Sequence, residues 1–159
     1  MYSHKRVLVA LDGSAAGEAV MKLLMEIAGP LDMTIMLVHV LEPIAPSVAD
    51  GTVVFDDVDA RRDEAEEYLA PISAMLRSQG VDTSWAIRHG RPADEILAAA
   101  TESGAGLIAM ATHGRTGLGR LLFGSVAEAV LRRATVPVFL IRQPQTVEAV
   151  PVARQESVR

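Results

Sequence analysis

The residues best suited to bind a ligand lie in a loop rich in glycine, arginine and threonine. This loop lies between two apolar segments in the last third of the chain. The loop begins at Thr112 and runs as THGRTGLG to Gly119. Glycines let the backbone turn its amides toward a ligand, while arginine and hydroxyl side chains add further donors. Gly124 and Ser125 follow, and a helix that starts there would offer free amides and a hydroxyl to a phosphate. The loop therefore predicts an anion-binding site.

Two common phosphate motifs do not fit this loop. Gly114 and Gly119 have the spacing of a Walker A loop, but Leu121 stands where that motif needs the hydroxyl that binds magnesium. A dinucleotide fingerprint needs a third glycine after Gly117 and Gly119, and the sequence has Leu122 there. Both motifs are excluded.

Apolar runs on either side of the loop predict two strands, which the intervening helix joins into one strand–helix–strand unit. Residues 107–111 (LIAMA) are uninterrupted apolar residues, as expected of a parallel strand covered on both faces. Three strands are predicted before them, the third of alternating character and near a sheet edge. The predicted strands span residues 5–11, 33–41, 81–88, 107–111 and 136–141.

Helical patterns separate these strands. The first helix follows the turn and cap residues at 12–14 and ends at Gly29 and Pro30. The second spans residues 59–79, where Pro71 is expected to kink or break it, and Gly80 supplies its stop. The third spans residues 93–103. Residues 42–58 show no sustained period and predict a long surface loop.

This order of elements predicts an α/β fold: a single doubly wound, five-stranded parallel sheet, Rossmann-like, with helices on both faces. In such sheets the ligand crevice lies at the carboxyl ends of the strands, where the strand order reverses. Residues 1–142 are predicted to form one domain. Residues 143–159 contain two prolines among polar and small residues, and we expect a disordered tail.

The composition narrows the class of protein. The 159 residues suit one domain, and half of them are apolar with few aromatics, so the core should be aliphatic. No apolar run approaches the length of a membrane span and the N-terminus lacks the shape of a signal peptide, so we expect a cytoplasmic protein. The absence of cysteine excludes disulfides and thiol catalysis. A formal charge of -5 argues against nucleic-acid and anionic-membrane partners.

The spacing of glycines in the loop resembles the C-terminal signature of the universal stress protein family. In the ATP-binding branch of that family the pattern is Gly, two residues, Gly, nine residues, then Gly followed by Ser, Thr or Asn. Gly114, the nine residues 115–123 and the pair Gly124-Ser125 match it, and Ala111 replaces the first Gly. Residues 9–14 (VALDGS) look like the family's N-terminal signature. The resemblance implies strand order 3-2-1-4-5, which puts Asp12 beside the loop that starts at Met110.

The resemblance also implies a nucleotide site and the role of each residue in it. Asp12 would accept hydrogen bonds from the nucleotide, Val40 would contact the adenine edge, and Met110 would pack on the nucleoside. Ala10 and Leu11 would flank the base, and the glycine signature would bind the phosphates. A Mg²⁺ or Mn²⁺ ion would be held mainly by the phosphates. The implied nucleotide-binding set is Ala10, Leu11, Asp12, Val40, Met110, Ala111, Thr112, His113, Gly114, Arg115, Gly124, Ser125 and Val126.

The sequence of the last predicted strand indicates a protein partner. Residues 136–141 are apolar and β-branched and should lie at a sheet edge, and an exposed apolar edge is normally covered or paired. Members of the family that the chain resembles dimerise through this strand. We therefore expect a homodimer with Val136, Val138 and Leu140 at or near its interface.

Several polar residues have structural explanations that compete with functional ones. His113 could act as a base, but no paired carboxylate or nucleophile lies near it in sequence, so a loop-stabilising role is favoured. His39 on an apolar strand is interpreted as a core histidine whose ring is hydrogen-bonded. Asp56, Asp57 and Asp59 lack the spacing of a metal loop and are interpreted as a solvated helix start.

Three functions remain open from the sequence. The first is a nucleotide-dependent stress-response regulator that binds ATP. The second is a slow ATPase or adenylyl-transfer enzyme of related fold, against which stands the absence of an evident water-positioning base. The third is a protein-interaction module with an empty site, which only Ala111 supports.

Overall fold

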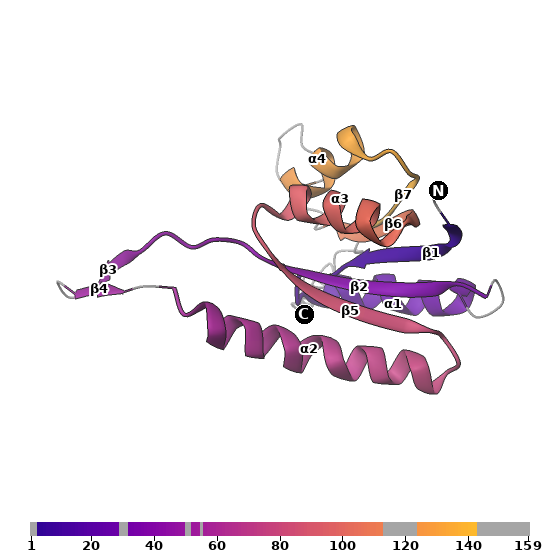
Figure 1. Cartoon of the computed structure of the whole chain (residues 1–159), viewed down its shortest axis with the longest axis horizontal. Helices are drawn as coiled ribbons and strands as arrows, with labels where there is room; N and C mark the ends of the chain where they lie inside the picture. Colours follow the sequence, from indigo (N-terminus) through magenta and orange to yellow (C-terminus); the bar gives the residue numbers. More distant parts are fainter. Residues whose placement is uncertain (1–2, 29–31, 50–51, 55, 113–123, 143–159) are drawn as a thin grey trace, which may run out of the picture.

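The computed structural model describes residues 3–28, 32–49, 52–54, 56–112 and 124–142. Five parallel strands form one sheet in the order β5-β2-β1-β6-β7 (Figure 1). Numbered along the chain among themselves, these strands have the order 3-2-1-4-5, so the predicted fold class is confirmed. The strands are β1 (Ser3–Ala10), β2 (Thr34–Leu41), β5 (Thr83–His89), β6 (Ala105–Thr112) and β7 (Val138–Arg142).

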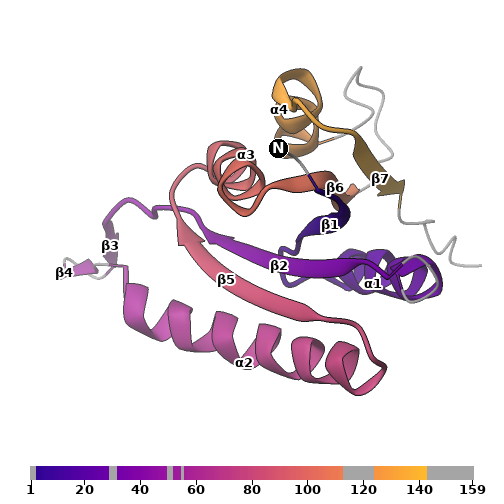
Figure 2. The same cartoon turned by 45° about the vertical axis from the view of Figure 1, so that its right-hand side comes forward.

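Helices cover both faces of the sheet, as Figure 2 shows. One apolar cluster joins the sheet to α1 (Ala15–Ala28) and α2 (Val58–Ser78), and a second joins it to α3 (Pro92–Ser103) and α4 (Ser125–Arg133). Alternation along β1 divides its side chains between the two clusters: Val7 and Val9 belong to the first and Leu8 to the second. All three side chains are fully buried, which makes β1 the centre of the core.

The connection between β2 and α2 is predicted as a long surface loop, and the structure shows that it also contains two short strands. It contains β3 (Ser47–Ala49) and β4 (Thr52–Val54), which pair antiparallel. We call residues 43–49 and 52–54 the arm, and Figure 1 shows it extending away from the sheet. Val48 and Val53 in the arm are 71% and 52% exposed. The sequence prediction failed because strands of three residues are too short to show a period.

The sequence predicts that Pro71 kinks or breaks the second helix. It does not break it, because α2 continues through Pro71. Pro71 is exposed, so the carbonyl group that loses its amide partner can be hydrated. The buried face of α2 carries Leu69 and Leu76, both fully buried. Within the described residues, no helix is long and apolar enough to cross a membrane.

Candidate functional site

A cavity of about 480 Å³ opens at the carboxyl ends of β1, β2 and β6. The strand order reverses at β1, because the chain runs from β1 to β2 and β5 on one side and to β6 and β7 on the other. This is the position at which doubly wound sheets bind ligands. The cavity is lined by Ala10, Leu11, Asp12, Val38, His39, Val40, Glu42, Arg61, Pro92, Ile96, Met110, Ala111, Thr112, Gly124, Ser125, Val126 and Ala127.

Main-chain pairing aligns the ends of the three strands. Ala10 lies opposite Val38 of β2 and Met110 of β6. Beyond β1, the amide of Leu11 donates to the carbonyl of Val38 at 2.9 Å. The Leu11 carbonyl in turn accepts a hydrogen bond from Nδ1 of His39 at 2.9 Å. Leu11 is therefore fixed to β2 through both its amide and its carbonyl.

His39 is half-buried and hydrogen-bonded, as the sequence predicts, and it also lies on the wall of the cavity. Because a carbonyl can only accept, Nδ1 of His39 carries a proton in this arrangement. The ring meets Tyr68 of α2 edge to face, with centroids 6.3 Å apart. His39 thus links the end of β1 to α2 across the cavity wall.

Asp12 directly follows Leu11 and holds the turn that leads into α1. Its Oδ1 accepts hydrogen bonds from the amide and the hydroxyl of Ser14, at 3.0 and 2.5 Å. This is a local side-chain turn of the kind that aspartate favours. Asp12 therefore stabilises the turn before α1, and the same residue lines the cavity.

The start of α4 contributes partial positive charge to the lining, in contrast to the acidic Asp12. The helix begins at Ser125, the start that the predicted anion site requires, and Gly124 occupies its N-cap position with no side-chain cap. The first amides of a helix carry partial positive charge and bind anions. A methyl group added at Gly124 would meet no described atom within 4 Å. This helix end can therefore accept an anionic group from the cavity.

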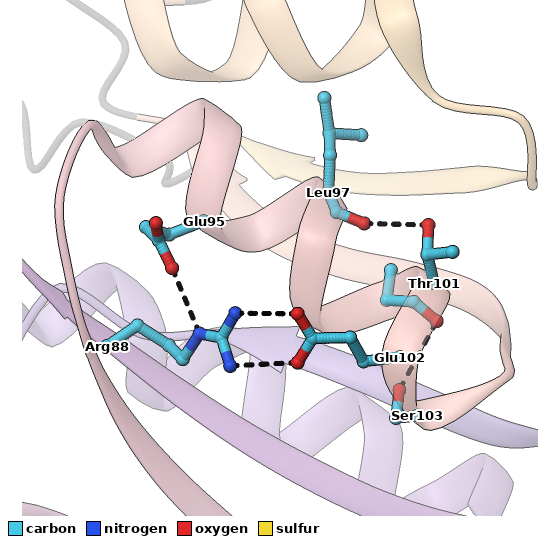
Figure 3. Close-up of polar contacts among 7 residues, drawn as sticks. Arg88, Glu95, Leu97, Thr101, Glu102 and Ser103 are labelled. Atoms are coloured by element: carbon cyan, nitrogen blue, oxygen red, sulfur yellow. Dashed lines mark hydrogen bonds and ion pairs between the residues drawn. The ribbon is translucent and has the colours of Figure 1, made fainter.

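Ion pairs hold α3 beside the cavity, to which it contributes Pro92 and Ile96. Figure 3 shows Arg88 of β5 donating from Nε to Glu95 at 3.0 Å and bidentately to Glu102 at 2.9 and 3.0 Å. Hydrogen bonds to Glu102, which have the larger effect, and to Glu95 raise the pKa of Arg88. The same contact with Arg88 lowers the pKa of Glu102. The pairs fix α3 to β5.

A second pair joins α3 to α4. Arg133 in the last turn of α4 donates to Asp94 in the first turn of α3. This hydrogen bond lowers the pKa of Asp94. The pair thereby connects two of the helices that line the cavity.

The structure brings together every predicted site residue that it describes. Ala10, Leu11, Asp12, Val40, Met110, Ala111, Thr112, Gly124, Ser125 and Val126 all line the cavity. The remaining three predicted residues, His113, Gly114 and Arg115, lie outside the described residues. Chemically, the lining combines the acidic residues Asp12 and Glu42 and the basic residue Arg61 with a helix N-terminus and apolar side chains, a combination suited to binding. Among described residues, no group of three His, Asp or Glu side chains could hold a metal ion.

Sequence reasoning missed the other lining residues: Val38, His39, Glu42, Arg61, Pro92, Ile96 and Ala127. The turn HGRP at residues 89–92 was a usable signal for Pro92, because it follows the strand next to β2. Ala127 lies one residue beyond the predicted set. Nothing in the sequence pointed to Arg61, because its position depends on the path of the connection between β2 and α2.

The strand order, the two helical layers and the cavity at the order reversal define an α/β protein of Rossmann-like fold. The chain belongs to the universal stress protein family, whose model matches residues 3–142. A universal stress protein of Methanocaldococcus jannaschii is 31% identical over 144 residues, which cover 89% of this chain and 84% of the relative.

Two solved structures place the fold in the same family. A protein of the universal stress protein family from Burkholderia pseudomallei aligns with a TM-score of 0.67 and 29% identity, covering 87% of this chain and 96% of the other. The universal stress protein from Archaeoglobus fulgidus, solved in complex with dAMP, aligns with a TM-score of 0.62 and 25% identity. That alignment covers 89% of this chain and 99% of the other.

Proposed function

We propose that this universal stress protein binds an adenine nucleotide in the cavity, and that ATP is the nucleotide through which it acts in the stress response. The observation that carries the proposal is the lining of one cavity by Asp12 and by the start of α4, where the N-cap residue Gly124 makes no side-chain cap. A nucleotide needs both: an acceptor for its sugar hydroxyls and donors for its phosphates. The dAMP complex of the Archaeoglobus fulgidus protein supports the same class of ligand.

Each residue has a role in this proposal. The phosphates lie at the amides of Ser125 and Val126, beside Gly124, with Gly114 and Arg115 of the loop also contributing. Mg²⁺ or Mn²⁺ is held by the phosphates. The sugar hydroxyls donate to Asp12, and Met110 packs on the nucleoside. Ala10 and Leu11 flank the base, Val40 contacts its edge, and Ala111, Thr112 and His113 complete the set.

Ala111 is compatible with this proposal although the family signature has glycine there. It lies within β6, in register with Ile141 of β7. A regular strand position needs no positive φ, so the conformational freedom of glycine is not required. The methyl group occupies only part of the cavity wall, and we propose that the nucleotide binds beside it.

We also propose a homodimer through β7. Among the described strands, β7 is the last in the sheet order and pairs with β6 alone. Val138 and Leu140 are half-buried and pack against the cluster under α3 and α4, and Val136 precedes the strand. A second copy of β7 would cover the outer edge of these side chains.

The test of the proposed site is a calorimetric titration of nucleotide-free protein with ATP and Mg²⁺. The wild type is compared with the double variant Gly124→Val plus Ser125→Ala, whose fold is checked by circular dichroism. We expect micromolar binding by the wild type and none by the folded variant. Equal affinity in the two proteins would show that the phosphates do not bind at the start of α4, and no binding by the wild type would refute the proposed function.

A further inference from the structure

Arg61 of α2 joins the cavity to the arm. Its Nη1 donates to Oδ2 of Asp56 at 2.5 Å and its Nη2 donates to the carbonyl of Glu42 at 3.0 Å. Glu42 directly follows β2, and Asp56 precedes α2, so the two acceptors stand on opposite sides of the arm. One side chain therefore ties both ends of the arm together at the rim of the cavity.

The start of α2 directs Arg61 to this position. Asp57 caps the helix by accepting a hydrogen bond from the amide of Ala60 at 3.0 Å, and the amide of Arg61 donates to the carbonyl of Asp57 at 3.1 Å. Long helical side chains lean toward the helix N-terminus. Arg61, one turn into the helix, therefore reaches back to Asp56. The side chains of Arg61 and Asp56 are only 24% and 12% exposed, so the pair is partly shielded from water.

The three residues differ in their access to the cavity. Arg61 and Glu42 line it, whereas Asp56 does not. A guanidinium carries five N–H groups, so Arg61 can hold Asp56 and Glu42 and also donate to acceptor atoms of a ligand. A ligand in the cavity would thus contact Arg61 or Glu42. Asp56, which lies outside the cavity lining, would hold the Arg61 guanidinium in place.

We infer that Arg61 contacts the bound ligand and links occupancy of the cavity to the order of the arm, and that Asp56 is a positioning residue that acts on ligand affinity through Arg61. The inference rests on the proposed adenine-nucleotide function. Linkage is reciprocal: if the bound nucleotide favours the tied arm, then the tied arm favours the nucleotide by the same factor. The order of the arm, which carries the exposed Val48 and Val53, would then depend on whether the cavity holds a nucleotide.

A double-mutant cycle tests the inference. The wild type, Asp56→Ala, Arg61→Ala and the double variant are titrated with ATP and Mg²⁺, and Arg62→Ala serves as a control on an exposed neighbouring arginine. We expect Asp56→Ala to weaken binding by about fivefold or more. We also expect the double variant to bind no more weakly than Arg61→Ala, because Asp56 acts only through Arg61. Arg61→Lys keeps the charge but not the planar fork, and should resemble Arg61→Ala.

Hydrogen exchange in the arm distinguishes linkage from a purely structural effect. In the wild type, nucleotide should slow amide exchange in the non-proline residues of the arm, and in Asp56→Ala and Arg61→Ala it should not. If the wild type binds and Asp56→Ala has unchanged affinity, or if nucleotide leaves exchange in the wild-type arm unchanged, the inference is wrong and the proposed function stands. If the wild type binds no nucleotide, both fall together.

Discussion

Replacing Ser125 with Asp should change protein stability and nucleotide affinity in opposite directions. Ser125 is the first residue of α4, is exposed, and lines the cavity. A carboxylate in the first turn of a helix interacts favourably with the helix dipole, by about 0.3–1 kcal/mol. The nucleotide-free variant should therefore unfold at a temperature about 1–3 °C above that of the wild type.

The same carboxylate would oppose a phosphate bound at the helix start. Two like charges about 4 Å apart repel by about 1 kcal/mol in water and by about 4 kcal/mol near a protein surface. Because Ser125 is exposed, we take a repulsion of about 1.4–2 kcal/mol, which lies within the lower half of this range. ATP should then bind about 10- to 30-fold more weakly.

Calorimetric titrations with ATP and with adenosine check this reasoning. Adenosine has no phosphate, so its affinity should change by no more than about twofold. Ser125→Asn has the shape of the aspartate without its charge, and should bind ATP within about twofold of the wild type. Equal weakening of ATP and adenosine, or full ATP affinity in Ser125→Asp, would refute a phosphate position at the start of α4.

Three further changes test other parts of the structure. Gly90→Ala should destabilise the protein by about 1–3 kcal/mol in urea unfolding, because Gly90 has φ +149° and a Cβ there would lie 2.9 Å from Glu95; unchanged stability would mean that the turn relaxes freely. Glu102 has a pKa below its ordinary 4.5 in the folded protein, so its contribution to stability is present above pH 4.5 and is lost as the pH falls through the lowered value. The stability advantage of the wild type over Glu102→Gln should accordingly shrink on acidification, and a gap that is constant with pH would contradict the role of Arg88. Val138→Lys places a charge on the outer strand and should weaken the proposed dimer; a sedimentation profile identical to that of the wild type would exclude β7 as the interface.

The fold could be predicted largely because its causes are local, whereas the candidate site residues followed from the resemblance to the universal stress protein family. Buried parallel strands require continuous apolar runs, as at residues 107–111, and the carboxyl ends of such strands meet where their order reverses. The start of α4 could be placed because glycine followed by serine suits a helix start. Asp12 could be assigned a turn because the strand before it is evident, whereas its place in the site followed from the family resemblance.

The parts that sequence reasoning missed depend on the path of the chain in space. The strands of the arm are too short to show alternation, and Arg61 reaches the cavity only because the arm returns beside Glu42. Pro71 illustrates a different limit: its exposure, which decides whether a lost hydrogen bond is tolerated, follows from how α2 packs on the sheet.

A crystal structure of the protein with an adenine nucleotide tests the central claim most directly. We predict a phosphate within hydrogen-bond distance of the amides of Ser125 and Val126, sugar hydroxyls at Asp12, and the base beside Val40. A nucleotide bound outside this cavity, or one inside it with its phosphates away from α4, would contradict the account.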